Sequence, residues 1–350
     1  MKLLSLANFS RYGEANTALH RHRALCKIFP SQVDEFNINF HFGFTNKVLN
    51  KLFMKGINFS FVGTTSLNEK LIAQVKKNDY TIIWIDKGIA IKATTLKKIK
   101  SFNPNILIIG YSPDEMTQRH NQSTDFLNSL PYYDAFITTK SYAISDLKKL
   151  GAKKVYFVNN AFEPTFHYPR HIAQQDIEAL GGDIGFIGTW EQDRADAILF
   201  LAERGLKIRV WGAGRWLQYQ NKFNNLIIED KGLFSEEYSK ALSLFKINIC
   251  FLRKMNLDQQ TTRSMEIPAC GGFMLAERTS EHLALFEEGR EAVFFASNQE
   301  LYEQCLYYLN HEDERLKIRE SGYQKCLDAG YDNQQTIKRV LDEILNDVKL

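Results

Sequence analysis

The sequence contains no C-x-x-C pair, and its five cysteines are an odd number, so a disulfide-stapled secreted domain is not indicated. No apolar run approaches the roughly 20 residues that a helix needs to cross a bilayer. The first residues also lack the long apolar region and the cleavage site of a signal peptide. We therefore expect a cytoplasmic protein whose cysteines are reduced thiols.

Signals for metals and for tight dinucleotide binding are missing as well. The chain has no Asp-x-Asp motif, and its eight histidines are spread out, apart from His20 and His22 on one expected helix. We therefore expect no metal site and no cofactor. There is no G-x-G-x-x-G after the first strand, so a Rossmann dinucleotide site is not supported.

What the sequence does contain is a long alternation of strand and helix signals over 350 residues, a length that suits two domains. Apolar strands expected in the first half are 3–7, 36–40, 80–85, 106–111, 135–139 and 155–159. Those expected in the second half are 182–188, 207–212, 226–228, 247–252, 273–276 and 292–295. Since helical patterns separate them, we expect α/β domains with parallel sheets covered on both faces.

The polar, proline-containing stretch near residues 164–179 interrupts this alternation and is the best candidate for a linker. We expect an N-terminal domain over 1–165, a linker over 166–181 and a C-terminal domain over 182–332. The final helix, 333–350, has a one-sided apolar stripe.

The stretch DQQTTRSMEIPACGGFMLA, residues 258–276, has the pattern of a phosphate-binding unit. It lies between two apolar strands, with Thr261 or Thr262 placed to cap a short helix and Gly271 to end it. Free N–H groups in the first turn, with Arg263 beside them, suit a diphosphate.

Two acids of the same stretch are spaced for a nucleotide. Glu266 lies about one turn into the helix, where a carboxylate could accept hydrogen bonds from a ribose, and Asp258 precedes it by eight positions. Ordinary structural roles are the alternative: Arg263 and Glu266 as a surface pair, and the glycines as a helix cap. Gly188 and Thr189 follow another strand, and with Arg194 they could supply further N–H groups and a cation.

The residues TTRSMEIPACGGFMLAERTSEHLALFEEGREAVFF resemble the C-terminal domain of GT-B glycosyltransferases, in particular the group-1 type of the spore-maturation-protein-like family. IIGYSPDEM and the region 132–169 resemble the N-terminal half. The resemblance implies two Rossmann-like domains facing across a cleft, with a final helix that crosses back to the first domain. It also implies that Glu266 contacts the ribose, and that Asp258 replaces the glutamate that usually lies near the sugar.

The expected reaction is metal-independent transfer of a sugar from a nucleotide sugar on the second domain to an acceptor hydroxyl of a glycan, a glycolipid or other lipid-linked acceptor, or a protein on the first. If the anomeric configuration inverts, a general base is needed, and Asp114 and His120 follow an expected strand with Glu115 behind them. Each of the three could equally be a loop residue. Gly13 lies in the loop after the first strand, where backbone could approach the acceptor. A nucleotide-sugar epimerase, a phosphorylase and a non-catalytic two-lobed binding protein are the alternatives.

Charge is distributed unevenly along the chain. Residues 1–170 contain 23 Lys and Arg against 12 Asp and Glu, a balance of +11, whereas the remainder carries −8 and the total is +3. We expect weak association of the first half with an anionic membrane surface through Arg21, Arg23, Lys47, Lys51 and Lys55. No exposed apolar anchor is identifiable, so binding to neutral membranes should be slight. Solvated helix faces are the alternative, and nucleic acid is not expected because basic and aromatic residues do not interleave.

Overall fold

The computed structural model describes residues 1–10, 13–39 and 42–348, and the chain divides into two compact units. Unit 1 comprises residues 1–159 and 334–350, and unit 2 comprises residues 160–333. The boundary falls after Asn159, ahead of the expected linker, and residues 174–180 of that linker form a helix, α7 (Gln174–Leu180), that belongs to unit 2. Lys240 on α9 (Ser235–Leu244) pairs with Asp176 at 3.0 Å, which ties α7 into this unit.

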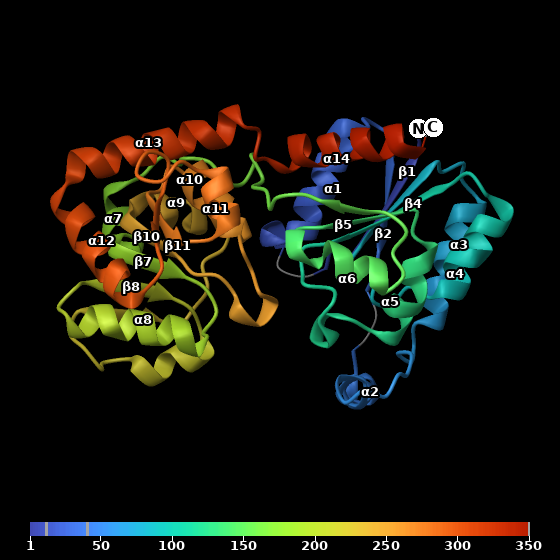
Figure 1. Ribbon diagram of the computed structural model, residues 1–350, viewed down its shortest axis with the longest axis horizontal. Coiled ribbons are helices and arrows are strands. Elements are labelled where there is room, and N and C mark those ends of the chain that lie inside the picture. The colour runs from blue at the N-terminus through green and yellow to red at the C-terminus, as the bar shows by residue number, and fades with distance from the viewer. Residues whose placement is uncertain (11–12, 40–41, 349–350) are drawn as a thin grey trace. The chain divides into compact units, whose positions relative to one another are not determined.

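Unit 1 is built on a six-stranded sheet in which all neighbouring strands are parallel, in the order β2-β1-β3-β4-β5-β6 (Figure 1). The strands are β1 (Leu3–Ala7), β2 (Val33–Asn37), β3 (Ile82–Asp86), β4 (Leu107–Ser112), β5 (Ala135–Thr138) and β6 (Val155–Phe157). The helices are α1 (Thr17–Ile28), α2 (Phe44–Met54), α3 (Thr65–Lys76), α4 (Ala93–Phe102), α5 (Thr124–Ser129), α6 (Ile144–Lys149) and α14 (Asn333–Val348). The expected strand 36–40 is found earlier, as β2, and its residue 40 lies outside the described residues.

Unit 2 repeats this plan with a parallel sheet in the order β12-β11-β10-β7-β8-β9. Its strands are β7 (Gly182–Ile187), β8 (Ile208–Trp211), β9 (Leu226–Glu229), β10 (Phe245–Cys250), β11 (Met274–Glu277) and β12 (Val293–Phe295). Besides α7, its helices are α8 (Gln192–Glu203), α9 (Ser235–Leu244), α10 (Thr262–Ala269), α11 (Ser280–Leu285), α12 (Asn298–Asn310) and α13 (Glu312–Asp328). The sequence patterns therefore predict both sheets, because fully buried parallel strands are nearly continuous apolar runs.

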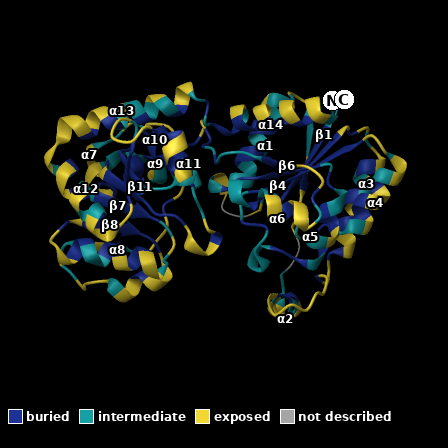
Figure 2. Cartoon of the chain, in the orientation of Figure 1, coloured by how far each residue is buried: buried dark blue, intermediate teal, exposed yellow. Residues whose placement is uncertain are grey.

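Apolar burial explains why α14 belongs to unit 1 although it ends the chain. Its stripe of Ile337, Val340, Leu341 and Ile344 is buried against the sheet in one cluster that includes Trp84. Tyr156 also donates a hydrogen bond to Asp347 at 2.7 Å. Buried residues, dark blue in Figure 2, follow the sheets of both units.

Each sheet has a point at which the chain reverses its direction of strand addition, between β1 and β3 in unit 1 and between β7 and β10 in unit 2. Loops leaving the carboxyl ends of strands at such a point diverge and leave room for a ligand. Within the described ranges, no helix is long and apolar enough to span a membrane.

Candidate functional site

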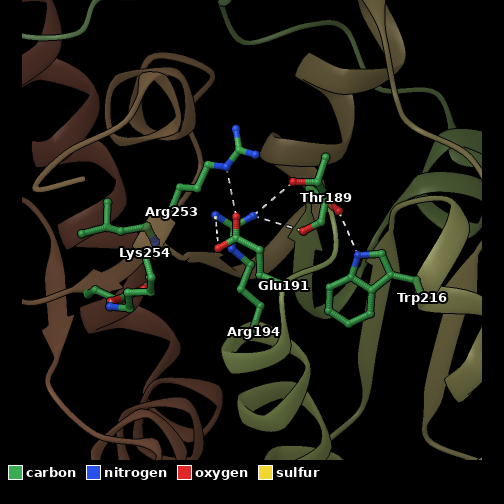
Figure 3. A network of polar contacts seen from close by, with 9 residues as sticks. Thr189, Glu191, Arg194, Trp216, Arg253 and Lys254 are labelled. Carbon is green, nitrogen blue, oxygen red and sulfur yellow. Dashed lines mark hydrogen bonds and ion pairs between the residues drawn. The ribbon is translucent and has the colours of Figure 1, made fainter. Parts of the chain in front are cut away.

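The loop after β7 is fixed by backbone and tryptophan hydrogen bonds. The Gly188 N–H donates to the Trp211 carbonyl at 3.0 Å. The Gly188 carbonyl accepts from the indole of Trp216, which is labelled in Figure 3, at 3.0 Å. A Cβ on Gly188 would lie 2.7 Å from the ring of Phe186, so a larger residue would displace this ring. These contacts hold the loop in place at the carboxyl end of β7, where the order of strand addition reverses between β7 and β10.

Arg194, in the first turn of α8, folds back over this loop. Its Nη1 donates to the Thr189 carbonyl at 3.1 Å and lies 3.4 Å from the Thr189 hydroxyl (Figure 3). Glu191 lies 3.7 Å from Arg194 and 3.1 Å from Arg253, so one carboxylate is shared between two cations. Burial, together with the nearby charge of Arg263, lowers the pKa of Arg194, and its Nε has no hydrogen-bond partner among the described residues.

The loop after β10 leads into α10, whose N-cap is Thr261. The Thr261 N–H donates to the Ser264 hydroxyl at 3.1 Å, whereas the N–H groups of Thr262 and Arg263 have no partner within the helix. Arg263 projects from the same turn, and its Nε is also buried without a partner among the described residues. Two arginines and a helix N-terminus therefore present unpaired donors at adjacent strand ends, an arrangement that suits an anion.

A buried histidine supports this helix start. The Nδ1 of His282 lies 2.6 Å from the Glu277 carbonyl, which can only accept, so Nδ1 carries the proton. The other ring nitrogen, 2.7 Å from the Ser264 hydroxyl, then accepts from Ser264. Burial lowers the pKa of His282, which favours this neutral form. The cap of α10 thus depends on an uncharged imidazole that no sequence pattern would select.

Glu266 lies one turn into α10, and its side chain is buried and contacts two other residues. Tyr238 donates a hydrogen bond to one carboxylate oxygen at 2.5 Å, and His167 Nε2 lies 3.6 Å from the other. Because His167 Nδ1 accepts from the Glu163 N–H at 3.0 Å, its Nε2 carries the proton and faces Glu266. A carboxylate accepts about four hydrogen bonds, so these contacts orient Glu266 without saturating it.

Asp258 and Gly271 lie outside that turn. Asp258 is half-buried in the loop before α10, and its N–H donates to the Arg253 carbonyl at 3.2 Å. Gly271 follows the end of α10 with a φ of 69°, about 13 Å along the helix from its first turn, and its N–H donates to the Pro268 carbonyl at 2.8 Å. Gly271 thus ends the helix, in agreement with the structural alternative, and its contact with a donor stays a prediction.

Unit 1 has a cavity of about 650 Å³ at the carboxyl ends of β1, β3 and β4, the reversal point of its own sheet. Arg21 on α1 forms a buried ion pair with Asp86 at 2.5 and 3.1 Å, and its guanidinium lies 4.6 Å from the centre of the Tyr111 ring. Lys87 pairs with Asp114 in the next loop. The cations of this cavity are thus already neutralised by carboxylates.

Of the acceptor-side residues selected from the sequence, Asp114 alone is among the residues that line this cavity. Asp114 lines the cavity, whereas His120, in a short 3₁₀ turn beside Asn121, does not. Glu115 is fully buried and accepts from the Thr117 N–H at 2.9 Å, so it holds its own loop. Gly13 has a φ of 50° and opens a 3₁₀ turn before α1, where its backbone conformation favours glycine.

Some site residues could not be selected from sequence patterns. Tyr238, His167 and His282 come from separate segments and meet α10 only in the folded unit. Within the described ranges, no group of three or more His, Cys, Asp or Glu side chains is placed to hold a metal ion.

Comparisons with known proteins agree with this architecture. Residues 194–342 match a family model described as glycosyl transferase-like. No curated protein sequence matches significantly. Among solved structures, Anabaena Alr3699/HepE in complex with UDP-glucose matches with a TM-score of 0.65 at 13% identity, covering 98% of this chain and 100% of that one.

Two further structures extend this similarity. Sucrose-phosphate synthase from Thermosynechococcus elongatus matches with a TM-score of 0.67 at 11% identity, covering 99% of this chain and 100% of that one. A candidate UDP-N-acetylglucosamine 2-epimerase from Listeria monocytogenes matches with a TM-score of 0.59 at 10% identity, covering 99% and 96%. The chain therefore has the GT-B glycosyltransferase fold, as its sequence resemblance predicts.

Proposed function

We propose that the protein is a glycosyltransferase that uses a nucleoside diphosphate sugar, with unit 2 as the donor domain and unit 1 as the acceptor domain. The observation that carries this proposal is the pair Arg194 and Arg263, two cations whose buried Nε atoms are unpaired among the described residues, beside a helix N-terminus. Both lie at or within the stretch that matches the glycosyl transferase-like family. Within the fold we assign the chain to the group-1, spore-maturation-like type.

The leaving group explains why such a site is needed. In the transfer, the acceptor oxygen bonds to the anomeric carbon while the bond from that carbon to the diphosphate oxygen breaks, and the diphosphate leaves with the electron pair. Arg194, Arg263 and the N–H groups of Thr262 and Arg263 would stabilise the negative charge that develops there. This is chemistry that fixed cations and dipoles can supply, so we propose that transfer proceeds without added metal.

Recognition of the nucleoside is assigned to Glu266. Its free acceptor positions would bind the ribose hydroxyls, with Tyr238 and His167 holding the carboxylate in place. Asp258 would lie nearer the sugar. We propose a UDP-sugar as the donor, because a structure of the same fold binds UDP-glucose.

The unit 1 cavity would hold the acceptor. The cavity is lined by two ion pairs, Arg21 with Asp86 and Lys87 with Asp114, and by the polar and apolar side chains of Asn16, Ile38 and Phe42. Such a lining suits a hydroxyl-rich glycan or the sugar end of a lipid-linked acceptor. If the reaction inverts configuration, the acceptor proton would pass to Asp114, which lines this cavity; His120 is the weaker candidate because it does not line the cavity. If configuration is retained, the acceptor proton would pass to the departing diphosphate oxygen, and no base from the protein is required.

An epimerase is the second candidate, because one structure of similar fold carries that description. Incubating the pure protein with a panel of UDP-, GDP- and ADP-sugars and a chelator separates the two. Release of nucleoside diphosphate, dependent on Arg194, supports the transferase. Proton NMR that shows only a change of sugar configuration in the intact donor would replace it with the epimerase.

A further inference from the structure

The α2 segment, which we define as residues 44–62, concentrates exposed apolar side chains in unit 1. They are Phe44 (82% exposed), Val48 (41%), Met54 (44%), Ile57 (47%), Phe59 (49%) and Val62 (51%). In Figure 2, α2 is coloured mainly as exposed. Exposed apolar groups gathered this closely usually mark an interaction surface, whereas scattered ones do not.

All charged side chains of the same segment are lysines. Lys47, Lys51 and Lys55 are exposed, and none of them has a carboxylate within ion-pair distance among the described residues. The sequence contains no Asp or Glu between Glu35 and Glu69. At 100° per residue, Phe44, Val48, Lys47 and Lys51 fall on one face of α2, and Lys55 follows the helix as its C-cap. That face therefore combines apolar contact with positive charge.

Hydrogen bonds on the opposite side hold this face in a fixed orientation. Asn46 and Val62 exchange two hydrogen bonds, at 3.1 and 2.9 Å, which join the helix to the end of the segment. Phe53 is buried, and Arg119 donates to its carbonyl at 2.7 Å and to Asn58 at 2.8 Å. The exposed side chains are thus presented by a braced element, which lowers the entropic cost of binding.

We propose that the α2 segment docks unit 1 on an anionic lipid bilayer surface. A helix that carries both lysines and large apolar residues at its exposed face is suited to the headgroup region, where lysine stems lie along the apolar boundary and their ammonium groups reach the phosphates. The absence of acids favours an anionic partner over a neutral one. The large exposed apolar side chains beside the lysines favour a bilayer over an acidic protein face. This proposal does not depend on the proposed sugar transfer.

Two expectations from the sequence change as a result. An apolar anchor does exist in the first half of the chain, so the expectation that none is present is wrong. Arg21 is not available as a contact, since it is buried against Asp86, and the charge of Arg23 is already paired with Glu14 at 2.6 Å. Binding should therefore have a salt-sensitive part from the three lysines and a salt-resistant part from the apolar residues.

The test is flotation of the full chain with vesicles of equal parts phosphatidylcholine and phosphatidylglycerol, compared with phosphatidylcholine alone. Replacing Lys47, Lys51 and Lys55 by Glu should weaken binding to the anionic vesicles about a hundred-fold at low salt, since each basic residue contributes on the order of 1 kcal/mol. The matched control replaces Lys70, Lys77 and Lys98, three exposed lysines of unit 1 outside the segment, by Glu.

The apolar part is tested by replacing Phe44, Val48 and Met54 with Ser, which should remove the binding that persists at high salt. The matched control replaces Leu283, Leu306 and Leu316, exposed apolar residues of unit 2. In a Phe59→Trp variant, tryptophan emission should shift to the blue on anionic vesicles and be quenched by brominated lipid.

Three results would overturn the proposal. The first is absence of flotation with anionic vesicles for a protein whose circular dichroism is normal. The second is an equal loss of binding in the segment and control lysine variants, which would assign the effect to overall charge. The third is a concentration-dependent dimer, without vesicle binding, that the serine variant dissociates.

Discussion

Two buried arginines, Arg21 in unit 1 and Arg194 in unit 2, occupy comparable places beside the carboxyl ends of parallel strands, yet their environments differ. Burial alone would lower the pKa of Arg21, but the charge of Asp86 and its hydrogen bonds more than offset it, so the pKa is raised. Burial also lowers the pKa of Arg194, and Glu191, shared with Arg253, does not offset it. Arg21 is neutralised by its own carboxylate, Asp86, and serves the fold. Arg194 shares one carboxylate with Arg253 and has an unpaired Nε among the described residues, so it is suited to an incoming anion.

The largest expected effect comes from breaking the neutralised pair. Arg21→Met would leave Asp86 as an unpaired buried charge, which should lower the free energy of unfolding by about 3–5 kcal/mol. Denaturant unfolding measures this. Nucleotide affinity of the folded variant should be unchanged, and Arg21→Met combined with Asp86→Leu should recover much of the stability. An equally unstable double variant would contradict the assignment of the loss to the orphaned charge.

In unit 2 we expect the arginine variants to lose nucleotide affinity and to keep their stability. Arg194→Met and Arg263→Met should each weaken UDP binding by roughly 1.5–3 kcal/mol, about ten- to a hundred-fold, because each removes a charge-assisted hydrogen bond. Stability should change little, since neither guanidinium loses a dedicated ion partner. Calorimetry gives the affinity and thermal unfolding gives the stability. If these variants bind UDP as tightly as the parent, the proposed difference between Arg21, which stabilises the fold, and Arg194, which binds an anion, is wrong.

A smaller effect is expected at Glu266, which acts on the nucleoside. Glu266→Gln should weaken UDP binding about ten-fold, with a loss of roughly 1.5 kcal/mol. It should also abolish discrimination between UDP and 2′-deoxy-UDP, which the parent should show. Tyr238→Phe, which leaves the carboxylate but removes one of its hydrogen bonds, should have a milder effect in the same direction. Full discrimination in Glu266→Gln would rule out the ribose contact.

The smallest effect is a pH dependence that should belong to unit 2. The pKa of His282 is lowered in the folded protein, so its contribution to stability is complete above the unfolded value of 6.5. As the pH falls below 6.5, the unfolded state binds the proton more readily and stability should decline by up to about 1.4 kcal/mol per pH unit. His282→Gln should flatten that part of the curve relative to the parent. An identical slope in both proteins would locate the titration elsewhere, with His22 as the next candidate.

The comparison also shows where sequence reasoning succeeds. The first strand, 3–7, agrees with β1 in both bounds, and the stripe on the final helix is buried as α14, because apolar periodicity reports burial directly. A cap at Thr261 or Thr262 is predicted for a similar reason, since hydroxyl residues favour helix starts, and the structure has Thr261 at this position.

Other features depend on contacts between distant segments. The support of Glu266 by Tyr238 and His167 joins three separate elements, and the pairing of Arg21 with Asp86 spans 65 positions. Helix α7 was missed because its polar, proline-flanked sequence has little apolar periodicity of its own. The exposed face of α2 was missed because a pattern of apolar residues does not reveal which ones remain uncovered.

The most direct measurement is calorimetric titration of the parent protein with UDP and with uridine, both in excess chelator. If unit 2 binds the donor through Arg194 and Arg263, UDP should bind at least about a hundred-fold more tightly than uridine, because only UDP offers a diphosphate to these cations. Equal affinities for the two ligands, or UDP binding that requires added Mg²⁺ or Mn²⁺, would contradict the account.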